Sequence, residues 1–246
     1  MSEYVAAFDH LIHWVDDIDA AMASYDALGL PTHASLTMPG FRNAGWTVDD
    51  ERYVELATVD DWDAVASSKY AQALEILRPA VQALPGPGLL TFAVDVPDAR
   101  AVAARLRAAG REVDEVEVRF EERNVGFVEV FVRDAPAHFP FFITYDPPRA
   151  ELARMRAEYR AAQGVTAGSG PDLSALLVRS ADPESEARLL GALVDCPVDG
   201  ATVALPGAEV RFEQGAPTGL YGIAVRGPGS PDLVSEVAGM TVVTES

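Results

Sequence analysis

Two side chains near the start of the chain, His10 and Glu55, are of the types that bind a divalent metal or transfer a proton. Each lies in a short apolar segment, residues 9–15 and 52–58, with the composition of a β-strand. A histidine nitrogen and a carboxylate oxygen suit zinc, iron, manganese or nickel. Without a metal, Glu55 is a candidate general base with His10 beside it.

Strand geometry decides which side chains can join this pair. Because side chains alternate across a strand, His10 and His13 are expected on opposite faces, so the two cannot bind one metal. Glu55 shares its expected face with Tyr53. The expected face of His10 carries three other side chains: Phe8, Ile12 and Trp14. Trp14 and Tyr53 would then line an aromatic pocket, or else belong to an ordinary core. If the sheet curls into a cup, His10 and Glu55 meet on its concave side.

The elements that position these residues are duplicated. A strand leading into an Asp-rich helix start occurs at residues 8–19 and again at 86–98. Overlaying residues 15–19 on 94–98 without a gap pairs His10 with Leu89. Each copy continues with a helix and three further strands. The repeat is therefore β-α-β-β-β, and we predict an α+β fold whose tandem modules form curved mixed sheets.

The predicted organisation has three parts. Residues 5–148 hold two paired modules, and residues 149–170 form a charged helix and a glycine-rich linker. Residues 171–246 form a third, related module. Within the first part, the modules are expected at 5–59 and 86–146, with a helical insert at 60–85. The strands of the third module are expected at 173–180, 202–205, 209–213 and 220–226.

Composition narrows the function classes. The 246 residues carry a formal net charge of −19, which disfavours nucleic acid and anionic membrane surfaces as partners. No apolar run approaches the roughly 18 residues of a membrane span. Cys196 is the only cysteine, so an internal disulfide is impossible. Together with an N-terminus that does not read as a signal peptide, this favours a cytoplasmic protein.

The order of four motifs resembles the glyoxalase-like branch of the vicinal oxygen chelate superfamily. These motifs are Asp9-His10, Asn43, Tyr53-Val54-Glu55-Leu56 and Pro140-Phe141-Phe142-Ile143. The resemblance implies paired modules around a cup that commonly holds a divalent metal. It also implies a small-molecule ligand and, since many such proteins pair modules between chains, a possible homodimer.

The same resemblance implies a metal site in the first and last strands of each module. These positions fall on His10 and Glu55 in the first module, and on Leu89 and Thr144 in the second. Leucine cannot bind a metal and a threonine hydroxyl is a weak ligand, so the set is incomplete. A third ligand was sought in His33 and His138, whose loop positions the pattern does not fix.

Further substrate contacts are expected around this pair. Arg42 beside Asn43 could bind a carboxylate or phosphate with two hydrogen bonds, or else be an ordinary surface arginine. Leu89, Thr91 and Thr144 are expected to line the second half of the cleft.

Two functions follow from these expectations. One is an enzyme, an isomerase, lyase or dioxygenase that acts on a small oxygen-bearing metabolite through Glu55 and His10, with or without a metal. The other is a binding protein that sequesters a drug or metabolite unchanged, which the missing metal ligands and the apolar lining favour.

Overall fold

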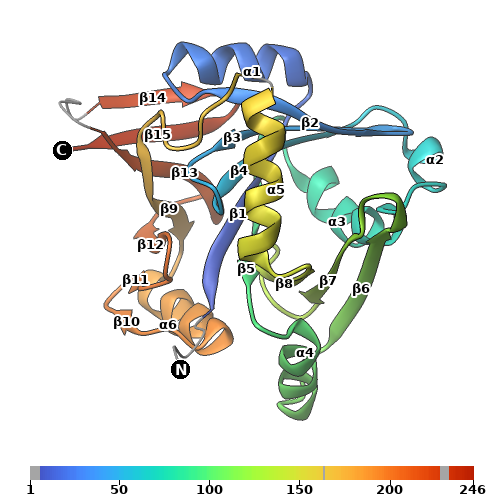
Figure 1. Ribbon diagram of the computed structural model, residues 1–246. Coiled ribbons are helices and arrows are strands. Elements are labelled where there is room, and N and C mark those ends of the chain that lie inside the picture. The colour runs from blue at the N-terminus through green and yellow to red at the C-terminus, as the bar shows by residue number, and fades with distance from the viewer. Residues whose placement is uncertain (1–5, 163, 228–232) are drawn as a thin grey trace.

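The computed structural model describes residues 6–162, 164–227 and 233–246, which form two mixed β-sheets (Figure 1). The first sheet has eight strands in the order β2-β3-β4-β1-β5-β8-β7-β6. Their bounds are β1 Ala7–Trp14, β2 Thr32–Met38, β3 Phe41–Thr47, β4 Tyr53–Val59, β5 Gly88–Asp95, β6 Val113–Phe120, β7 Val125–Val132 and β8 Phe141–Asp146.

Each half of this sheet is one β-α-β-β-β module. β1 pairs with β4 in parallel, β5 pairs with β8 in parallel, and the two modules join where β1 and β5 pair antiparallel. The crossover helices are α1 (Ile18–Ala27) and α4 (Ala99–Ala108). The carboxylates of Asp17 and Asp98 accept hydrogen bonds from free N–H groups in the first turns. The predicted tandem modules and mixed sheet are confirmed.

Three further helices lie between the modules and after them. The insert contains α2 (Trp62–Val65) and α3 (Ala71–Ala83), and the helix that joins the two sheets is α5 (Arg149–Ala162). Figure 1 shows α5 running along the first sheet, in front of its central strands. Its side chains reach the concave face of that sheet, where Leu152 is buried.

The second sheet has seven strands in the order β10-β11-β12-β9-β13-β15-β14. Their bounds are β9 Asp172–Ser180, β10 Val198–Asp199, β11 Thr202–Val203, β12 Glu209–Gln214, β13 Gly219–Arg226, β14 Leu233–Val237 and β15 Met240–Glu245. Helix α6 (Pro183–Val194) begins after Asp182, which caps it, with Pro183 at its first position.

The strand pairing in the second sheet corrects one expectation. β9 pairs with β12 in parallel and with β13 antiparallel, as β1 does with β4 and β5. Residues 220–226 are therefore not the last strand of a third module. They lie in β13, which opens a shortened fourth repeat completed by β14 and β15. The sequence hid this because β10 is a two-residue strand, too short for alternation to reveal, so the pattern assigns residues 220–226 as the missing strand in its place.

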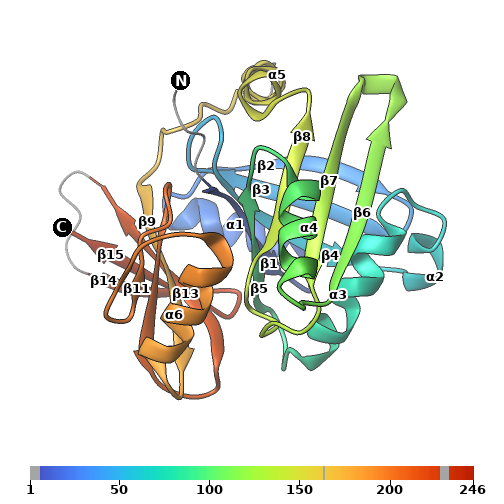
Figure 2. The same ribbon diagram turned by 90° about the horizontal axis from the view of Figure 1, so that it is seen from below.

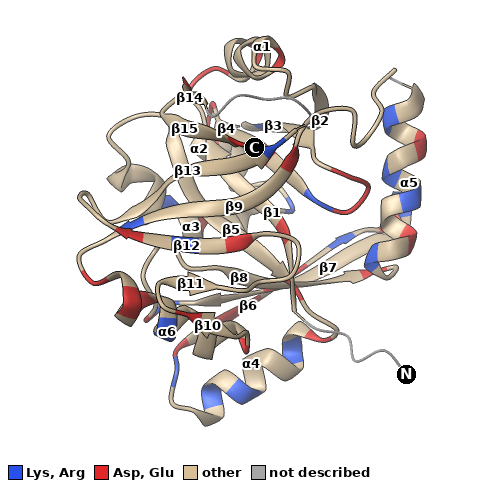
Figure 3. Cartoon of the chain, turned by 90° about the vertical axis from the view of Figure 1, so that its left-hand side faces the viewer, with Lys and Arg blue, Asp and Glu red and all other residues tan. Residues whose placement is uncertain are grey.

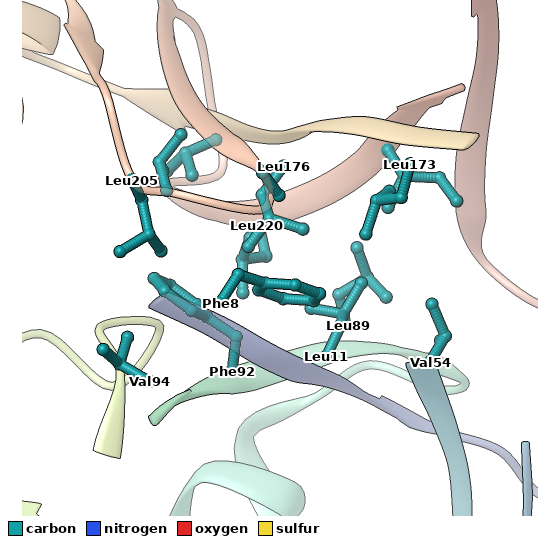
Figure 4. Close-up of a cluster of buried hydrophobic side chains, with 14 of the residues drawn as sticks. Phe8, Leu11, Val54, Leu89, Phe92, Val94, Leu173, Leu176, Leu205 and Leu220 are labelled. Atoms are coloured by element: carbon teal, nitrogen blue, oxygen red, sulfur yellow. The ribbon is translucent and has the colours of Figure 1, made fainter. Parts of the chain in front are cut away.

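The two sheets share one hydrophobic core. Figure 4 shows Phe8, Leu11 and Phe92 of the first sheet facing Leu176 and other leucines of the second sheet. Buried residues of α1, α4 and α6 belong to the same cluster. Seen from below in Figure 2, the two sheets stand side by side. The residues of the shared core come from both sheets and lie between them. Each sheet thus uses one face for the shared core, and the other face of the first sheet is left to form the site.

A β-bulge in the first strand corrects the predicted alternation. The pairing of β1 with β5 shifts register between Phe8 and His10. As a result Phe8 lies in the core between the sheets, while His10, Ile12 and Trp14 face the concave side as predicted. The extra residue is Asp9, whose side chain contacts His10 instead of the shared core. Bulges re-aim side chains in this way.

His13 lies on the opposite face from His10, as predicted, and ties the sheets together. Its Nε2–H donates to the carbonyl oxygen of Ala238 at 2.8 Å, and its Nδ1 accepts from the hydroxyl of Tyr25 at 2.7 Å. Burial lowers the pKa of His13 from 6.5 to about 4, although the bond to Ala238 opposes this shift. The folded protein therefore holds His13 neutral at pH values where the unfolded chain protonates it.

Acid is expected to weaken the fold through His13. Because the pKa of His13 is lower in the folded protein, its contribution to the free energy of unfolding is complete above pH 6.5. As the pH falls toward 4, this contribution is progressively lost, and the loss is on the order of 3 kcal/mol. Urea unfolding at pH 7 and pH 4.5, with His13→Gln as the comparison, measures this. The variant keeps an amide donor and acceptor but no titrating ring, so equal losses in both proteins would contradict the assignment.

The charged residues are distributed over the described elements. Figure 3 shows acidic residues spread over many elements, and basic residues recurring along α5. Within the described ranges, no helix combines the length and the apolar character needed to cross a bilayer.

Candidate active site

The concave face of the first sheet encloses a cavity of about 630 Å³. This is within the usual range for small-molecule sites. Strands of both modules form its floor, and residues of α3 and α5 contribute to its walls. Most lining side chains are apolar or aromatic, among them Trp14, Phe41, Tyr70, Phe127, Phe131 and Phe141. The few polar side chains among them define the chemistry.

His10 and Glu55 meet in this cavity. Nε2 of His10 lies 3.5 Å from Oε2 of Glu55. The amide nitrogen of Asn43 donates to the other carboxylate oxygen of Glu55 at 2.6 Å. The ring of His10 stacks on Tyr53, with 4.7 Å between ring centroids. β1, β3 and β4 therefore hold one carboxylate in a defined orientation, with one oxygen bound by an amide and the other beside an imidazole.

The bulged residue Asp9 fixes the histidine from behind. Its Oδ1 accepts from Nδ1 of His10 at 2.6 Å and from the hydroxyl of Tyr145 at 2.8 Å. Its Oδ2 forms an ion pair with Nε of Arg149 at 3.2 Å. Burial alone would raise the pKa of Asp9, but the bond and charge of His10 and the charges of Arg149 and Arg156 together lower it. Asp9 is thus a buried carboxylate that turns Nε2 of His10 toward Glu55.

A cationic side chain of α5 closes this cluster. The guanidinium of Arg156 lies over the rings of Tyr53 and Tyr145, at 5.1 and 5.2 Å from their centroids. Such stacking of a guanidinium on aromatic rings is favourable. Burial acts to lower the pKa of Arg156, and Tyr53, Tyr145 and Asp9 outweigh it. Arg156 thus places a fixed positive charge beside the aromatic rings and Asp9.

A second carboxyl group in the cavity was missed by the sequence analysis. Glu129 of β7 lines the cavity and is only 8% exposed. Burial and the charge of Glu55 raise the pKa of Glu129 to about 8. A sequence signal did exist: Val125–Val132 is apolar except for a glycine at its second position and one glutamate in its middle. That glutamate can be read as a solvated edge residue until the sheet is known to curl.

The other residues predicted for the site divide into two groups. Trp14, Tyr53 and Asn43 line the cavity with His10 and Glu55. Arg42 lies outside it, where its exposed guanidinium contacts the carboxylate of Asp19 at 3.3 Å. Its neighbour in β3 points to the cavity, so Arg42 points away.

The three residues predicted for the second module also lie outside the cavity. Leu89 faces the second sheet in the shared core (Figure 4). The buried hydroxyl of Thr91 donates to the carbonyl oxygen of Phe139. The hydroxyl of Thr144 bonds with Val96 and the first N–H of α4.

The helix caps explain why the second-module positions were displaced. The two capping residues, Asp17 and Asp98, are equivalent, whereas the ungapped overlay pairs Asp19 with Asp98. The corrected overlay pairs His10 with Thr91 and Ile12 with Ala93. The strand pairing agrees, since His10 faces Ala93 and Ile12 faces Thr91 across the junction.

The same overlay identifies the counterparts of Glu55 and Asn43. Ile12 pairs with Glu55, and its counterpart Ala93 pairs with Phe141, so Phe141 takes the place of Glu55. By the same register, Glu129 takes the place of Asn43.

These positions test whether a metal fits. His10 and Glu55 offer two donors, and the carboxylate behind His10 is a common companion of a metal-bound histidine. The counterparts offer a threonine hydroxyl already bonded to Phe139 and a phenylalanine ring. Within the described ranges, no group of three or more His, Cys, Asp or Glu side chains is placed to hold an ion. The residues present do not fit a four-ligand metal site.

The two histidines considered as a third ligand lie apart from this pair. His33 lines the cavity wall, and its Nδ1 lies 3.4 Å from the hydroxyl of Thr47. Burial is the largest of the effects that lower the pKa of His33. His138 contacts Glu186 of α6 at 3.3 Å, between the two sheets.

Removing metal is expected to leave the fold unchanged. Two donors alone do not supply the binding energy of a tight site, which commonly has three or four protein ligands. The melting temperature should therefore be the same before and after dialysis against EDTA, in the wild type and in His10→Ala. A lower melting temperature after EDTA in the wild type alone would show that a tight site exists.

Comparison with known proteins supports the fold. A family model described as a glyoxalase-like domain matches residues 8–194. A crystal structure of a hypothetical protein from Staphylococcus aureus has a TM-score of 0.78 at 17% identity, covering 98% of this chain and 99% of that one. A mutant of 4-hydroxymandelate synthase from Streptomyces coelicolor has a TM-score of 0.51 at 14% identity, covering 91% and 71%.

Methylmalonyl-CoA epimerase from Mycobacterium tuberculosis has a TM-score of 0.41 at 24% identity, covering 58% of this chain and 91% of that chain. Among proteins of curated function, no significant match was found. Because the family model spans most of the chain, the protein belongs to the glyoxalase-like domain family, as the resemblance in the sequence predicted.

Proposed function

We propose that this protein is an enzyme that transfers a proton at a carbon atom next to a carbonyl group, in a small and largely apolar molecule bound in the cavity. The observation that carries the proposal is the setting of Glu55. Its carboxylate is oriented by Asn43 at 2.6 Å, faces His10 at 3.5 Å, and opens into an aromatic cavity. A positioned carboxylate in a largely apolar site is suited to act as a general base.

The reaction is balanced without an oxidant or a second substrate. A carboxylate oxygen of Glu55 takes a proton from the carbon, and the bonding electrons move to the carbonyl oxygen to form an enolate. Return of the proton to another carbon, or to the other face of the same carbon, gives an isomer. His10 is held by Asp9 through Nδ1, so Nε2 stays directed toward the region in which the proton moves.

A second candidate function is sequestration of a ligand without turnover. It is favoured by the aromatic lining and by Thr91 and Phe141, which replace potential metal ligands. A protein that only binds would use Glu55 and His10 to orient the ligand.

Deuterium exchange separates these two functions. The protein is incubated in D₂O with a panel of aryl ketones, α-hydroxyketones and acyl thioesters, and NMR follows label entering the carbon next to the carbonyl. Exchange above the buffer rate supports proton transfer. Binding by thermal shift without exchange supports sequestration, and neither response contradicts both functions.

A further inference from the structure

Glu129 is a buried polar side chain of the cavity that the reaction above does not use. Its Oε2 is buried and has no hydrogen-bond partner among the described residues. Leaving a buried carboxyl oxygen unpaired costs stability, because the group has lost its hydrogen bonds to water. A fold selected for stability alone would have an apolar side chain here. This unsatisfied group therefore points to a ligand.

The surroundings of Glu129 decide its charge state. On its own strand the cavity face also carries Phe127 and Phe131; Phe131 stacks on Phe141 with 5.0 Å between ring centroids. From the insert, Tyr70 stacks on Phe127 at 5.8 Å. None of these groups carries a positive charge.

The charged and titratable groups that act on Glu129 also favour its neutral form. Glu55 on β4 adds a negative charge. Tyr70 is a neutral phenol, because burial and, to a smaller extent, nearby carboxylates raise its pKa. Arg156 lies over Tyr53 and Tyr145 instead, and among the described residues no arginine offsets the effect of burial and Glu55 on the pKa of Glu129. With a pKa of about 8, Glu129 is mostly a carboxylic acid at neutral pH, so its O–H is a hydrogen-bond donor.

The internal repeat shows what this donor lacks. In the first module, the amide of Asn43 donates to Glu55 on the adjacent strand. In the second module Glu129 occupies the place of Asn43, and the place of Glu55 is taken by Phe141, which has no acceptor. One module therefore contains both donor and acceptor, and the other contains the donor alone.

We propose that Glu129 donates a hydrogen bond to an uncharged oxygen atom of the molecule in the cavity, and that this selects carbonyl compounds over amines. The inference deepens the proposed function and rests on it in taking the oxygen to be that of the reacting carbonyl. There, the same hydrogen bond strengthens as negative charge develops on the enolate oxygen. Glu129 and Glu55 then have complementary roles, as acid-form donor and as base.

Matched ligands test this donor. The probes are 2-acetylnaphthalene, labelled with ¹³C at its carbonyl, and 2-isopropenylnaphthalene, in which a CH₂ group replaces the oxygen. At pH 6.5 the wild type should bind the ketone about tenfold more tightly than the alkene, as expected for one buried hydrogen bond. At pH 9.5, where Glu129 is ionised, this preference should disappear. The infrared band of the labelled carbonyl should shift to lower frequency on binding.

Two variants assign the effect to the side chain. Glu129→Leu should lose both the ketone preference and the infrared shift, and Glu129→Gln should keep part of each because its amide still donates. Phe127→Leu, a change in the same wall without a donor, should keep both. The melting temperature of Glu129→Leu should equal or exceed that of the wild type, since no unpaired oxygen remains.

Specific results would overturn the inference. An unchanged ketone preference in Glu129→Leu would do so. So would tighter binding of 1-(2-naphthyl)ethylamine than of the ketone, increasing with pH, because that describes a carboxylate that binds a cation. These readouts require no turnover. Loss of the preference with proton exchange intact removes only the role of Glu129, and absence of exchange with the preference intact removes only the proposed reaction.

Discussion

Replacement of Glu55 by glutamine should reduce proton exchange by about 10³-fold while leaving ligand binding nearly unchanged, since a positioned general base contributes on this scale. The glutamine side chain has the same shape, and its carbonyl oxygen can still accept from Asn43, which holds Glu55 at 2.6 Å in the wild type. Its amide nitrogen can face Nε2 of His10. Only the ability to accept a proton is removed.

The measurement is the rate of deuterium incorporation into a ketone that the wild type exchanges, with its Kd determined in parallel. Glu117→Gln is a matched control, because Glu117 is an exposed glutamate whose partner is Arg100 on the surface. This control should exchange at the wild-type rate. A Glu55→Gln protein with more than about a tenth of that rate would show that another group removes the proton.

The sequence could predict the fold of the first half because local signals there agree with each other. Asp17 and Asp98 are capping residues, apolar segments alternate, and both copies follow one order. His10 and Glu55 could be paired for the same reason: each lies near the middle of a strand on the face that curls inward. Local patterns and a repeat are enough to bring these two residues together.

The remaining features depend on contacts that a single sequence does not display. The overlay paired Asp19 with Asp98, although Asp17 is the residue equivalent to Asp98, so it placed Leu89 where Thr91 belongs. The register of β8 against β5 is likewise not visible in the sequence, so Thr144 was chosen where Phe141 lies opposite Ala93. The bulge at Asp9 is visible only as a shift in pairing with β5. Glu129 looks like an exposed strand residue until a curved sheet and α3 enclose it.

The mutual packing of the sheets was also beyond local patterns. It requires Phe8 to turn away from His10, which the bulge makes possible. The two-residue strand β10 of the third module left no pattern in the sequence, and so the fourth repeat was not recognised.

Replacement of Asp9 by asparagine should destabilise the protein by about 3–5 kcal/mol, the usual cost of removing one partner from a buried ion pair. Asp9 is fully buried and binds His10, Tyr145 and Arg149. An asparagine has a similar shape but no charge. Arg149, whose side chain is 10% exposed, would lose its closest carboxylate partner. Urea unfolding at pH 7 measures the change, with the exposed Asp16→Asn as a control expected within about 0.5 kcal/mol of the wild type.

The same variant connects the bulge to the chemistry. Without the carboxylate, the asparagine can accept from Nδ1–H of His10 only through its amide oxygen, and the imidazole loses the charge that holds its orientation. The rate of deuterium exchange into the ligand should therefore be lower in Asp9→Asn than in the wild type, even at a low temperature at which the variant stays folded. If Asp9→Asn and the wild type have the same free energy of unfolding, Asp95 by itself compensates the charge of Arg149. Oδ2 of Asp95 lies 3.6 Å from Nη1 of Arg149. Burial raises the pKa of Asp95 to about 6 despite Arg149, so the folded protein binds a proton at Asp95 more tightly than the unfolded chain does, and the contribution of Asp95 to stability rises as the pH falls from 6 toward 3.8.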